Sequence, residues 1–146
     1  MRSLLFALGF IAFTGLTTSA EAQGASCSAS PGMSPEILGT YVDDYGGLQA
    51  VSDHFWYSGG LVFEDCSVDN VQHRIVAHNN LANKYNPGKF SRFEWTKNGN
   101  KLWYCQIVFD ADTEQAAASA PPADATHPST GGCGTFAWSE LIRILP

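Results

Sequence analysis

Two short acidic clusters in the sequence have the residue types that acid–base catalysis or calcium binding would use. Asp43 and Asp44 are adjacent, but neighbouring side chains of a strand point to opposite faces, so this pair would not flank one substrate bond. The run 110–114 alternates oxygen ligands, but it lacks the glycine and the distant glutamate of an EF-hand loop. We therefore interpret Asp43 and Asp44 as turn residues and Asp112 as a helix cap, and we predict no metal and no cofactor.

The histidines and serines do not form a recognisable catalytic or metal-binding pattern. His73 and His78 lie on one expected strand, where their spacing places them on opposite faces. No serine lies in the G-x-S-x-G turn that exposes the nucleophile of α/β-hydrolases. The catalytic residues therefore stay unassigned, and an exported hydrolase remains an alternative only if carboxylates and histidines converge in the fold.

The first residues are typical of an export signal. An apolar run over 4–16 follows a basic residue, and 20–22 has the A-x-A spacing at which signal peptidases cut. We predict a signal peptide over 1–22, a flexible leader over 23–35, and a secreted or periplasmic protein. No apolar run reaches the roughly 20 residues of a membrane-spanning helix. The residues before Cys27 do not fit a lipoprotein signal, so a lipid anchor at Cys27 is disfavoured.

The four cysteines are expected to form two disulfides, because thiols pair in an oxidising compartment. Cys–His nucleophilic catalysis is disfavoured for the same reason. We predict the pairs Cys27–Cys66 and Cys105–Cys133, which join sequence neighbours. The second pair would hold a segment over 116–132 that is rich in Ala, Ser, Thr, Pro and Gly. We predict that this segment is a loop that buries almost no apolar surface, and that its part over 116–130 is dispensable for folding.

Charge and aromatic content favour a binding function. The net charge of −6 disfavours nucleic acid as a partner, because phosphate neutralisation needs a surplus of basic groups. Basic residues nevertheless gather between 84 and 101, and aromatic residues make up 12% of the chain. We expect a small apolar or anionic amphiphilic ligand, and core packing of the aromatic residues is the alternative left open. The candidate ligand-binding residues are Trp56, Lys89, Arg92, Trp95 and Trp103.

Short β-type runs separated by glycine or asparagine predict an antiparallel meander. The clearest hairpin joins 90–97 to 101–109 across Asn98-Gly99-Asn100, which tolerate the positive φ of a tight turn. Asp112 and Gln115 have capping-box spacing and predict one short helix over 113–119. We therefore expect a single all-β domain over 36–146, whose meander closes into a small barrel or curled sheet. The other expected strands are 37–43, 48–57, 61–66 and 71–78, and 136–145 is a strand or a short helix.

Four segments carry a family resemblance, with the sequences NPGKFSRFEWT, LWYCQ, FDA and GCG at 86–96, 102–106, 109–111 and 132–134. Together they resemble a family of small exported bacterial proteins over 37–141. This resemblance implies export, but it implies no activity and no catalytic residue. Gly39-Thr40-Tyr41 is also similar to the Gly-x-Trp that opens lipocalin barrels, with tyrosine in place of tryptophan, and it adds to the expectation of a barrel.

We therefore expect an exported module that binds a small ligand or docks on the cell envelope. The competing hypotheses are an exported hydrolase and a purely structural envelope protein. An open apolar cavity would favour binding, and a filled core would favour the structural role. A cleft that gathers His54, His73 or His78 with carboxylates would favour catalysis.

Overall fold

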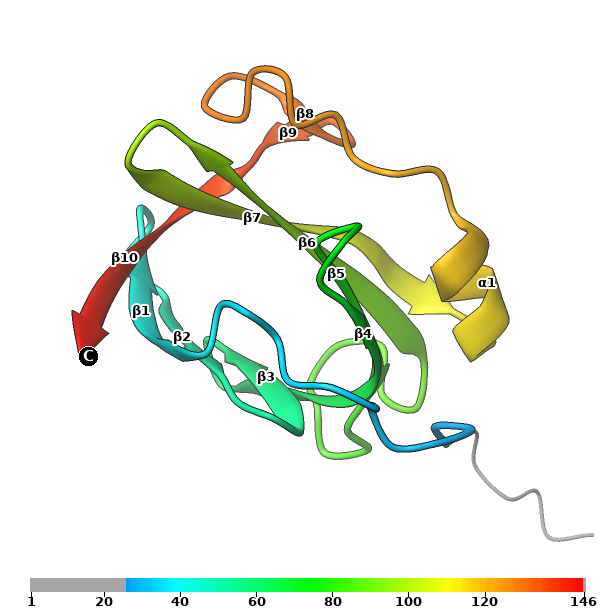
Figure 1. The fold of residues 1–146 in the computed structure, drawn as a ribbon. Coiled ribbons are helices and arrows are strands. Elements are labelled where there is room, and N and C mark those ends of the chain that lie inside the picture. The colour runs from blue at the N-terminus through cyan, green and yellow to red at the C-terminus, as the bar shows by residue number, and fades with distance from the viewer. Residues whose placement is uncertain (1–25, 146) are drawn as a thin grey trace, which may run out of the picture.

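The computed structural model describes residues 26–145 and contains a closed antiparallel barrel with one short helix (Figure 1). The predicted signal peptide over 1–22 lies outside the described residues. The barrel strands are β1 (Gly39–Asp43), β2 (Leu48–Val51), β3 (Phe55–Ser58), β4 (Leu61–Asp69), β5 (Arg74–Asn79), β6 (Phe90–Asn98), β7 (Lys101–Ala111) and β10 (Ser139–Leu145). The connection between β7 and β10 contains α1 (Glu114–Ser119) and a small ribbon of β8 (Gly132–Cys133) and β9 (Phe136–Ala137).

The barrel strands follow one another in sequence order around the barrel, and β10 closes it by pairing with both β7 and β1. Short β runs joined by tight turns favour such a meander. The predicted all-β fold, antiparallel barrel, short helix and disulfide pairs are confirmed. The Cys27–Cys66 bridge ties the start of the described chain to β4, and the Cys105–Cys133 bridge ties β7 to β8.

The single strand expected over 48–57 is wrong, because the chain reverses between β2 and β3. Ser52 forms the turn: its hydroxyl accepts the backbone N–H of Phe55, and its own N–H donates to the Phe55 carbonyl. Serine and aspartate side chains at 52–54 compete with the strand ladder for backbone groups, so they favour a turn.

Two further boundaries differ from the predicted ones. The strand expected over 71–78 begins at Arg74, because His73 adopts a left-handed φ of 52° in the preceding turn. The helix is capped by Thr113 in place of the predicted Asp112, since the Thr113 side chain accepts the N–H of Ala116. The run over 136–145 is strand rather than helix.

An aromatic core fills the inside of the barrel. Trp56 stacks on Phe93 with ring centroids 4.6 Å apart, and Phe63 meets Phe93 edge-on at 4.9 Å. All three side chains are buried. Aromatic pairs in these arrangements contribute about 0.5–1.5 kcal/mol beyond their buried area. The core therefore fixes how β3, β4 and β6 pack across the barrel.

The chain that enters β1 covers one end of the barrel. Ile37 is buried there, and Trp95 donates its Nε1–H to Oε1 of Glu36 at 3.0 Å. Asn70 accepts the backbone N–H of Glu36. The sequence predicts a flexible leader over 23–35, and its described part is bonded to the barrel through a disulfide and hydrogen bonds. This end of the barrel is therefore closed.

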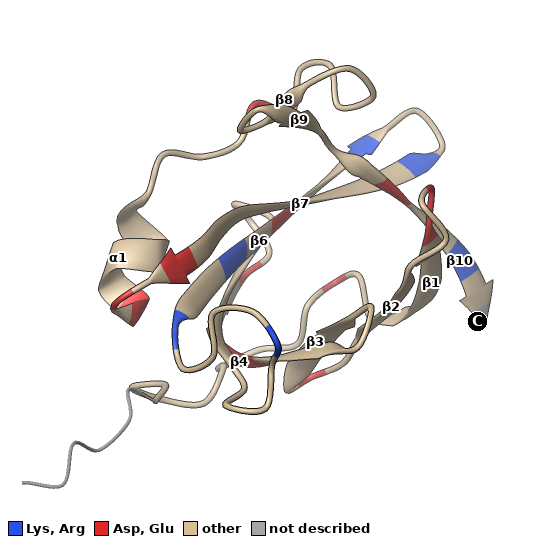
Figure 2. Ribbon diagram, turned by 180° about the vertical axis from the view of Figure 1, so that it is seen from behind, with Lys and Arg blue, Asp and Glu red and all other residues tan. Residues whose placement is uncertain are grey.

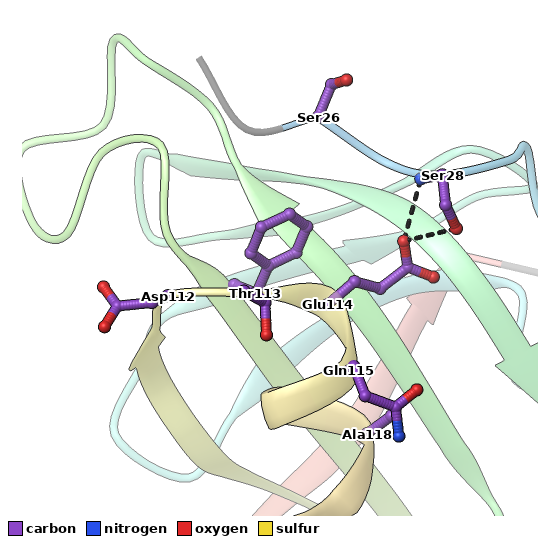
Figure 3. A pocket seen from close by; sticks show the side chains of 8 residues that line it. Ser26, Ser28, Asp112, Thr113, Glu114, Gln115 and Ala118 are labelled. Carbon is purple, nitrogen blue, oxygen red and sulfur yellow. Dashed lines mark hydrogen bonds between the residues drawn. The ribbon is translucent and has the colours of Figure 1, made fainter. Parts of the chain in front are cut away.

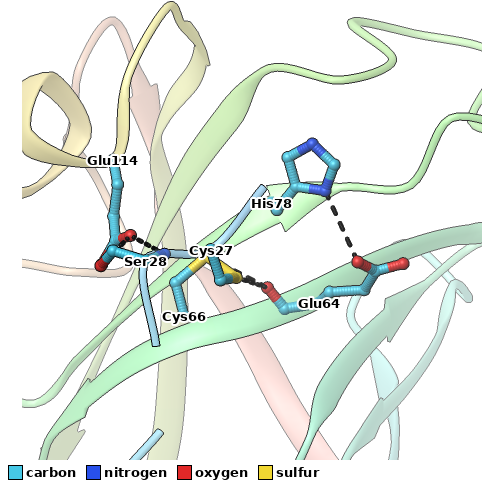
Figure 4. The surroundings of a disulfide bond; sticks show 6 residues. All are labelled: Cys27, Ser28, Glu64, Cys66, His78 and Glu114. Carbon is cyan, nitrogen blue, oxygen red and sulfur yellow. Dashed lines mark hydrogen bonds and ion pairs between the residues drawn. A yellow bond between two sulfur atoms is a disulfide. The ribbon is translucent and has the colours of Figure 1, made fainter. Parts of the chain in front are cut away.

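The Cys27–Cys66 bridge lies beside β4 (Figure 4). Because Sγ of Cys27 is bonded to Cys66, it is not free to carry a lipid thioether. Two disulfides are consistent with a protein outside the cytoplasm. Within residues 26–145, none of the helical structure has the length and apolar character that crossing a membrane requires.

The connection over 112–138 covers the outer face of β5, β6 and β7 (Figure 1). Arg92, on the outer face of β6, is buried beneath it and donates to the carbonyls of Ala117, Ala118, Ala120 and Pro121. The expectation that 116–132 buries almost no apolar surface is therefore wrong. Small residues pack there: Ala117 and Pro128 are both buried.

The basic residues between 84 and 101 do not form one surface patch. They are spread along the β6–β7 hairpin and the loop before it (Figure 2). Acidic residues pair with three of them, one on β6 itself and two from other elements, so part of the positive charge of this stretch is locally neutralised. The pairs are Lys89–Asp112, Arg92–Glu94 and Lys101–Glu140.

Candidate functional site

The end of the barrel opposite the entering chain is open, and we call it the barrel mouth. A pocket of about 460 Å³ lies there against the β5–β6 loop, residues 80–89, and a second pocket of about 270 Å³ lies between β7 and β9. Both pockets contain Gln106 and Phe109 of β7, so they adjoin along that strand. The mouth is lined by Leu61, Phe63, Asn79, Lys84, Tyr85, Asn86, Gln106 and Phe109 in the first pocket, and by Tyr45, Tyr104, Phe136 and Ser139 among others in the second.

Exposed aromatic rings surround the mouth. Tyr45 is 78% exposed, Tyr85 59%, Phe109 47% and Phe136 70%. Singly exposed apolar residues are common on protein surfaces, but rings that gather around one recess are typical of a binding surface. Lys84 lies beside them, with Nζ 5.1 Å from the centroid of the Tyr85 ring. The rim therefore combines apolar faces with a positive charge.

Asparagine side chains hold the β5–β6 loop in place beside the mouth. Asn83 accepts the backbone N–H of Val62 on β4 and donates to the carbonyl of the same residue, as a neighbouring strand would. Asn79 donates to the carbonyl of Asn86 in the loop and to that of Phe109 on β7. The loop is thus fixed to both sides of the mouth, and the pocket does not depend on a ligand for its shape.

Polar side chains face the inside of the barrel below the rim. Ser91 on β6 is fully buried and lies 2.7 Å from Oδ1 of Asn79, and Gln106 on β7 lies 3.0 Å from Ser91 Oγ. Deeper, Tyr104 donates its hydroxyl to Asp43 at 3.3 Å. Burial raises the pKa of Tyr104, so this hydroxyl stays protonated and neutral. The interior is therefore a hydrogen-bonded network of polar side chains above an aromatic core.

Asp43 and Asp44 do not converge into a catalytic pair. Oδ1 of Asp43 accepts the backbone N–H of Tyr45 at 3.0 Å and that of Gly47 at 2.6 Å, which closes the β1–β2 turn. Asp44 instead accepts the backbone N–H of Glu140. Both carboxylates are used to hold backbone groups, in agreement with their interpretation as turn residues.

The structure does not bring the predicted ligand-binding residues together. Trp56 and Trp95 are buried inside the barrel, whereas Arg92 and Trp103 are buried on its outer face under the 112–138 connection. Lys89 lies before β6 and pairs with Asp112. None of these five residues lines the two pockets of the mouth. For the tryptophans, the burial favours core packing, the alternative that the sequence left open.

Sequence reasoning did not select the residues that line the mouth. A signal for Gln106 was present, since it is the amide within the inward series of Leu102, Tyr104 and Gln106 on an otherwise apolar strand. Tyr45 and Tyr85 stand in turns next to glycine or asparagine, where a large ring buries little surface in its own element. Their common position at one opening depends on the barrel closing.

Another groove, of about 460 Å³, lies beside α1 (Figure 3). Glu114 points across it and accepts hydrogen bonds from the backbone N–H and the hydroxyl of Ser28. Asp112, at its edge, pairs with Lys89. Both carboxylates are thus engaged with the protein, and we do not assign a ligand to this groove.

The histidines do not line the mouth, and the nearby carboxylates of Asp43 and Asp44 in the β1–β2 turn are engaged in hydrogen bonds with the protein. His78 is 3.5 Å from Glu64 on the outer side of the barrel, near the Cys27–Cys66 bridge (Figure 4), and His73 is 3.6 Å from Glu36 at the closed end. No Asp, Glu or His lines either mouth pocket. Within residues 26–145, no group of three His, Cys, Asp or Glu side chains is arranged to hold a metal ion. The lining of the mouth thus consists of apolar, aromatic and polar side chains together with the cation Lys84.

Comparison with known proteins adds no homologue to this picture. No family model matches the chain, and no curated protein or solved structure shows significant similarity to it. The resemblance to small exported bacterial proteins therefore stays a prediction. Function is inferred from the geometry of the barrel mouth.

Proposed function

We propose that this protein binds a small anionic amphiphile in the barrel mouth. The observation that carries the proposal is the lining itself, which combines apolar walls, an aromatic rim and the cation Lys84 and contains no Asp, Glu or His. The larger pocket, at about 460 Å³, falls within the range of about 300–1,000 Å³ that small-ligand sites occupy. A hydrolase that uses a carboxylate or a histidine as its general base would need one in the lining, and the two pockets contain neither.

The lining suggests how such a ligand would lie. Its apolar part would contact Leu61, Phe63 and Phe109, and each buried methylene would contribute about 0.8 kcal/mol. Its anionic group would lie near Lys84, where an exposed charge pair contributes only about 0–1 kcal/mol. Affinity would therefore come from the apolar part, and Lys84 would set the orientation of the ligand.

We further infer that the protein acts outside the cytoplasm, as a secreted or periplasmic protein released by cleavage after residue 22. The two disulfides support this location, because such bonds persist in oxidising compartments. The anchored N-terminal chain is compatible with cleavage there, since the bonds that hold it begin at Cys27.

Calorimetric titration with dodecanoate tests the proposed binding. Lys84→Gln should weaken binding roughly 2- to 5-fold at low salt, and this difference should shrink as salt screens the charge. Phe109→Ala should weaken binding about 10-fold at every salt concentration, because it removes apolar area. Lys97→Gln is the matched control. It makes the same change in net charge, and Lys97 is exposed near the end of β6 that lies away from the β5–β6 loop.

The result that would overturn the proposal is the absence of binding by folded wild-type protein to dodecanoate, dodecyl sulfate and dodecyl phosphate at millimolar concentration. Equal effects of Lys84→Gln and Lys97→Gln would contradict the position of the anionic group. If none of the three amphiphiles binds, the exposed rim would be better explained as a surface that docks on another macromolecule of the envelope.

A further inference from the structure

A chain of hydrogen bonds behind the mouth determines which atom of Gln106 a ligand can meet. The chain begins at Asn79, whose Nδ2 lies 2.9 Å from the carbonyl oxygen of Asn86 and 3.0 Å from that of Phe109. Carbonyl oxygens only accept hydrogen bonds, so the atom that faces them must be the NH₂ group. Oδ1 of Asn79 is therefore directed to the other side and can only accept.

Ser91 is the next member of the chain. Its Oγ lies 2.7 Å from Oδ1 of Asn79 and 3.3 Å from the carbonyl oxygen of Phe109. The hydroxyl has one proton, and both of these neighbours are acceptors, so the proton is used toward one of them. In either case the lone pairs of Ser91 Oγ are left to accept a hydrogen bond.

Gln106 supplies that hydrogen bond. The end of its side chain lies 3.0 Å from Ser91 Oγ, and because Ser91 can only accept there, the nearer atom must be the donor Nε2. Its Oε1 is consequently the atom turned away from Ser91. None of the hydrogen bonds found among the described residues involves Oε1, and Gln106 lines both pockets of the mouth.

We propose that Gln106 selects ligands that carry an O–H or N–H donor close to their anionic group. This inference rests on the proposed binding of an anionic amphiphile. The carbonyl oxygen of Gln106 accepts that donor, while Ser91 and Asn79 prevent the amide from rotating to offer its NH₂ group instead. A ligand that places an ether or a methyl group at this position would leave Oε1 without a partner, so it would bind more weakly.

Three probes that differ at one position test the inference: 3-hydroxydodecanoate, dodecanoate and 3-methoxydodecanoate, each titrated by calorimetry below its aggregation concentration. Wild-type protein should prefer the hydroxy acid to the methoxy acid by about 10-fold or more, with dodecanoate between them. Gln106→Met should keep binding dodecanoate but lose the preference, because methionine has a similar shape and no strong acceptor.

Ser91→Ala tests the chain itself. Without the Ser91 hydroxyl, the Gln106 amide can rotate and donate to an ether oxygen, so discrimination against 3-methoxydodecanoate should fall several-fold while affinity for dodecanoate changes little. Gln72→Met is the matched control, because Gln72 lies exposed in the β4–β5 turn at the closed end. Circular dichroism and the melting temperature establish that each variant is folded, and Gln106→Met decides the question if Ser91→Ala does not fold.

The outcomes separate the two proposals. Equal binding of the three probes by wild-type protein, or an unchanged preference in Gln106→Met, would overturn the selection by Gln106 and leave amphiphile binding standing. Failure of all three probes to bind folded wild-type protein would overturn amphiphile binding itself. Loss of the preference in Gln106→Met together with its retention in Gln72→Met is the result that supports the inference.

Discussion

Individual polar side chains inside the barrel differ in how far their hydrogen-bonding needs are met. Asp43 is buried, but it accepts hydrogen bonds from two backbone N–H groups and from the side chains of Gln49 and Tyr104. Asp65 is also buried, opposite Ala77 of the core, and neither carboxylate oxygen has a partner among the described residues. Burial raises the pKa of Asp65 to about 7. This carboxyl is therefore protonated in the folded protein below neutral pH.

The pKa of Asp65 predicts a specific pH dependence of stability. In the unfolded chain an aspartate titrates near a pKa of about 3.9, so between that pH and about 7 the folded state binds a proton that the unfolded state does not. The stability that proton binding by Asp65 adds to the folded state is fully present below the pKa of Asp65 in the unfolded chain and is lost as the pH rises through 7. The total change in the free energy of unfolding is on the order of 4 kcal/mol. Asp65→Asn, which stays neutral, should be more stable than wild type at pH 8 and nearly equal at pH 4.

Urea unfolding at several pH values measures this difference. Asp53→Asn is the control, because Asp53 is exposed in the turn between β2 and β3. Subtracting the free energy of unfolding of each variant from that of the wild type at the same pH cancels the effect of the other carboxyl groups, which titrate in both proteins. If the difference in free energy of unfolding between wild type and Asp65→Asn stays constant from pH 4 to pH 8, Asp65 does not titrate as proposed.

The 112–138 connection is the element whose role changes most once the fold is known. Its composition is that of a loop, yet it supplies the carbonyls that surround Arg92 and the N–H of Ala123 that donates to Glu94 at 2.9 Å. Trp138 donates its Nε1–H to the carbonyl of Asp124. Backbone groups make most of these bonds, so a sequence rich in small residues can pack closely on the barrel.

Arg92 provides the test of this element. Arg92→Met removes the bonds to the connection and leaves Glu94 buried without its charge partner, which lies 2.9 Å away in the wild type. Breaking such a buried pair costs about 3–5 kcal/mol, so urea unfolding should show a loss of that size. Limited proteolysis should then cut within 120–131 faster than it does in the wild type.

Arg74→Met is the matched control for this prediction. Arg74 lies on the neighbouring strand, is half-buried, and is 3.9 Å from Asp69. Replacing it should cost no more than about 1 kcal/mol, as for other partly exposed pairs. Equal losses for Arg74→Met and Arg92→Met, with no new cleavage, would mean that the connection is dispensable for folding.

At the scale of the whole molecule, the two ends of the barrel are built differently. The entering chain, the aromatic stack and buried Ile37 close one end, while exposed rings and a fixed loop leave the other end open. An eight-stranded barrel is just wide enough either to be filled by side chains or to hold a small ligand. Here the lower part is filled and the upper part is left as a recess.

This asymmetry predicts where apolar residues contribute stability. Ile37→Ala should lower the free energy of unfolding by about 3 kcal/mol, because a buried side chain is replaced by a cavity. Phe136→Ser, at the rim, should change it by no more than about 0.5 kcal/mol, because that ring is 70% exposed. Chemical unfolding of both variants measures these changes in the free energy of unfolding. A large decrease for Phe136→Ser would show that the rim is part of the core.

Most of the fold could be predicted from local sequence, and most of the candidate site could not. Alternation of apolar residues, turn residues such as Asn98-Gly99-Asn100, and the number of cysteines predicted a barrel with both disulfides. The turn at Ser52 escaped detection because its neighbours have strand-like side chains. The tryptophans were correctly identified as large apolar groups, but their burial could not be read from the sequence.

The sequence by itself determined the acidic net charge and most of the strand pattern, and it favoured the cysteine pairing that the structure confirms, because these depend on residue types and on spacings along the chain. Tertiary structure alone decided that the connection covers Arg92 and Trp103, and that Gln106 meets Ser91 and the β5–β6 loop at one opening. Those contacts join segments far apart in the chain, and nothing local distinguishes the strand face that another element covers. Closing the barrel is what brings the turns of β1, β5 and β7 around one mouth.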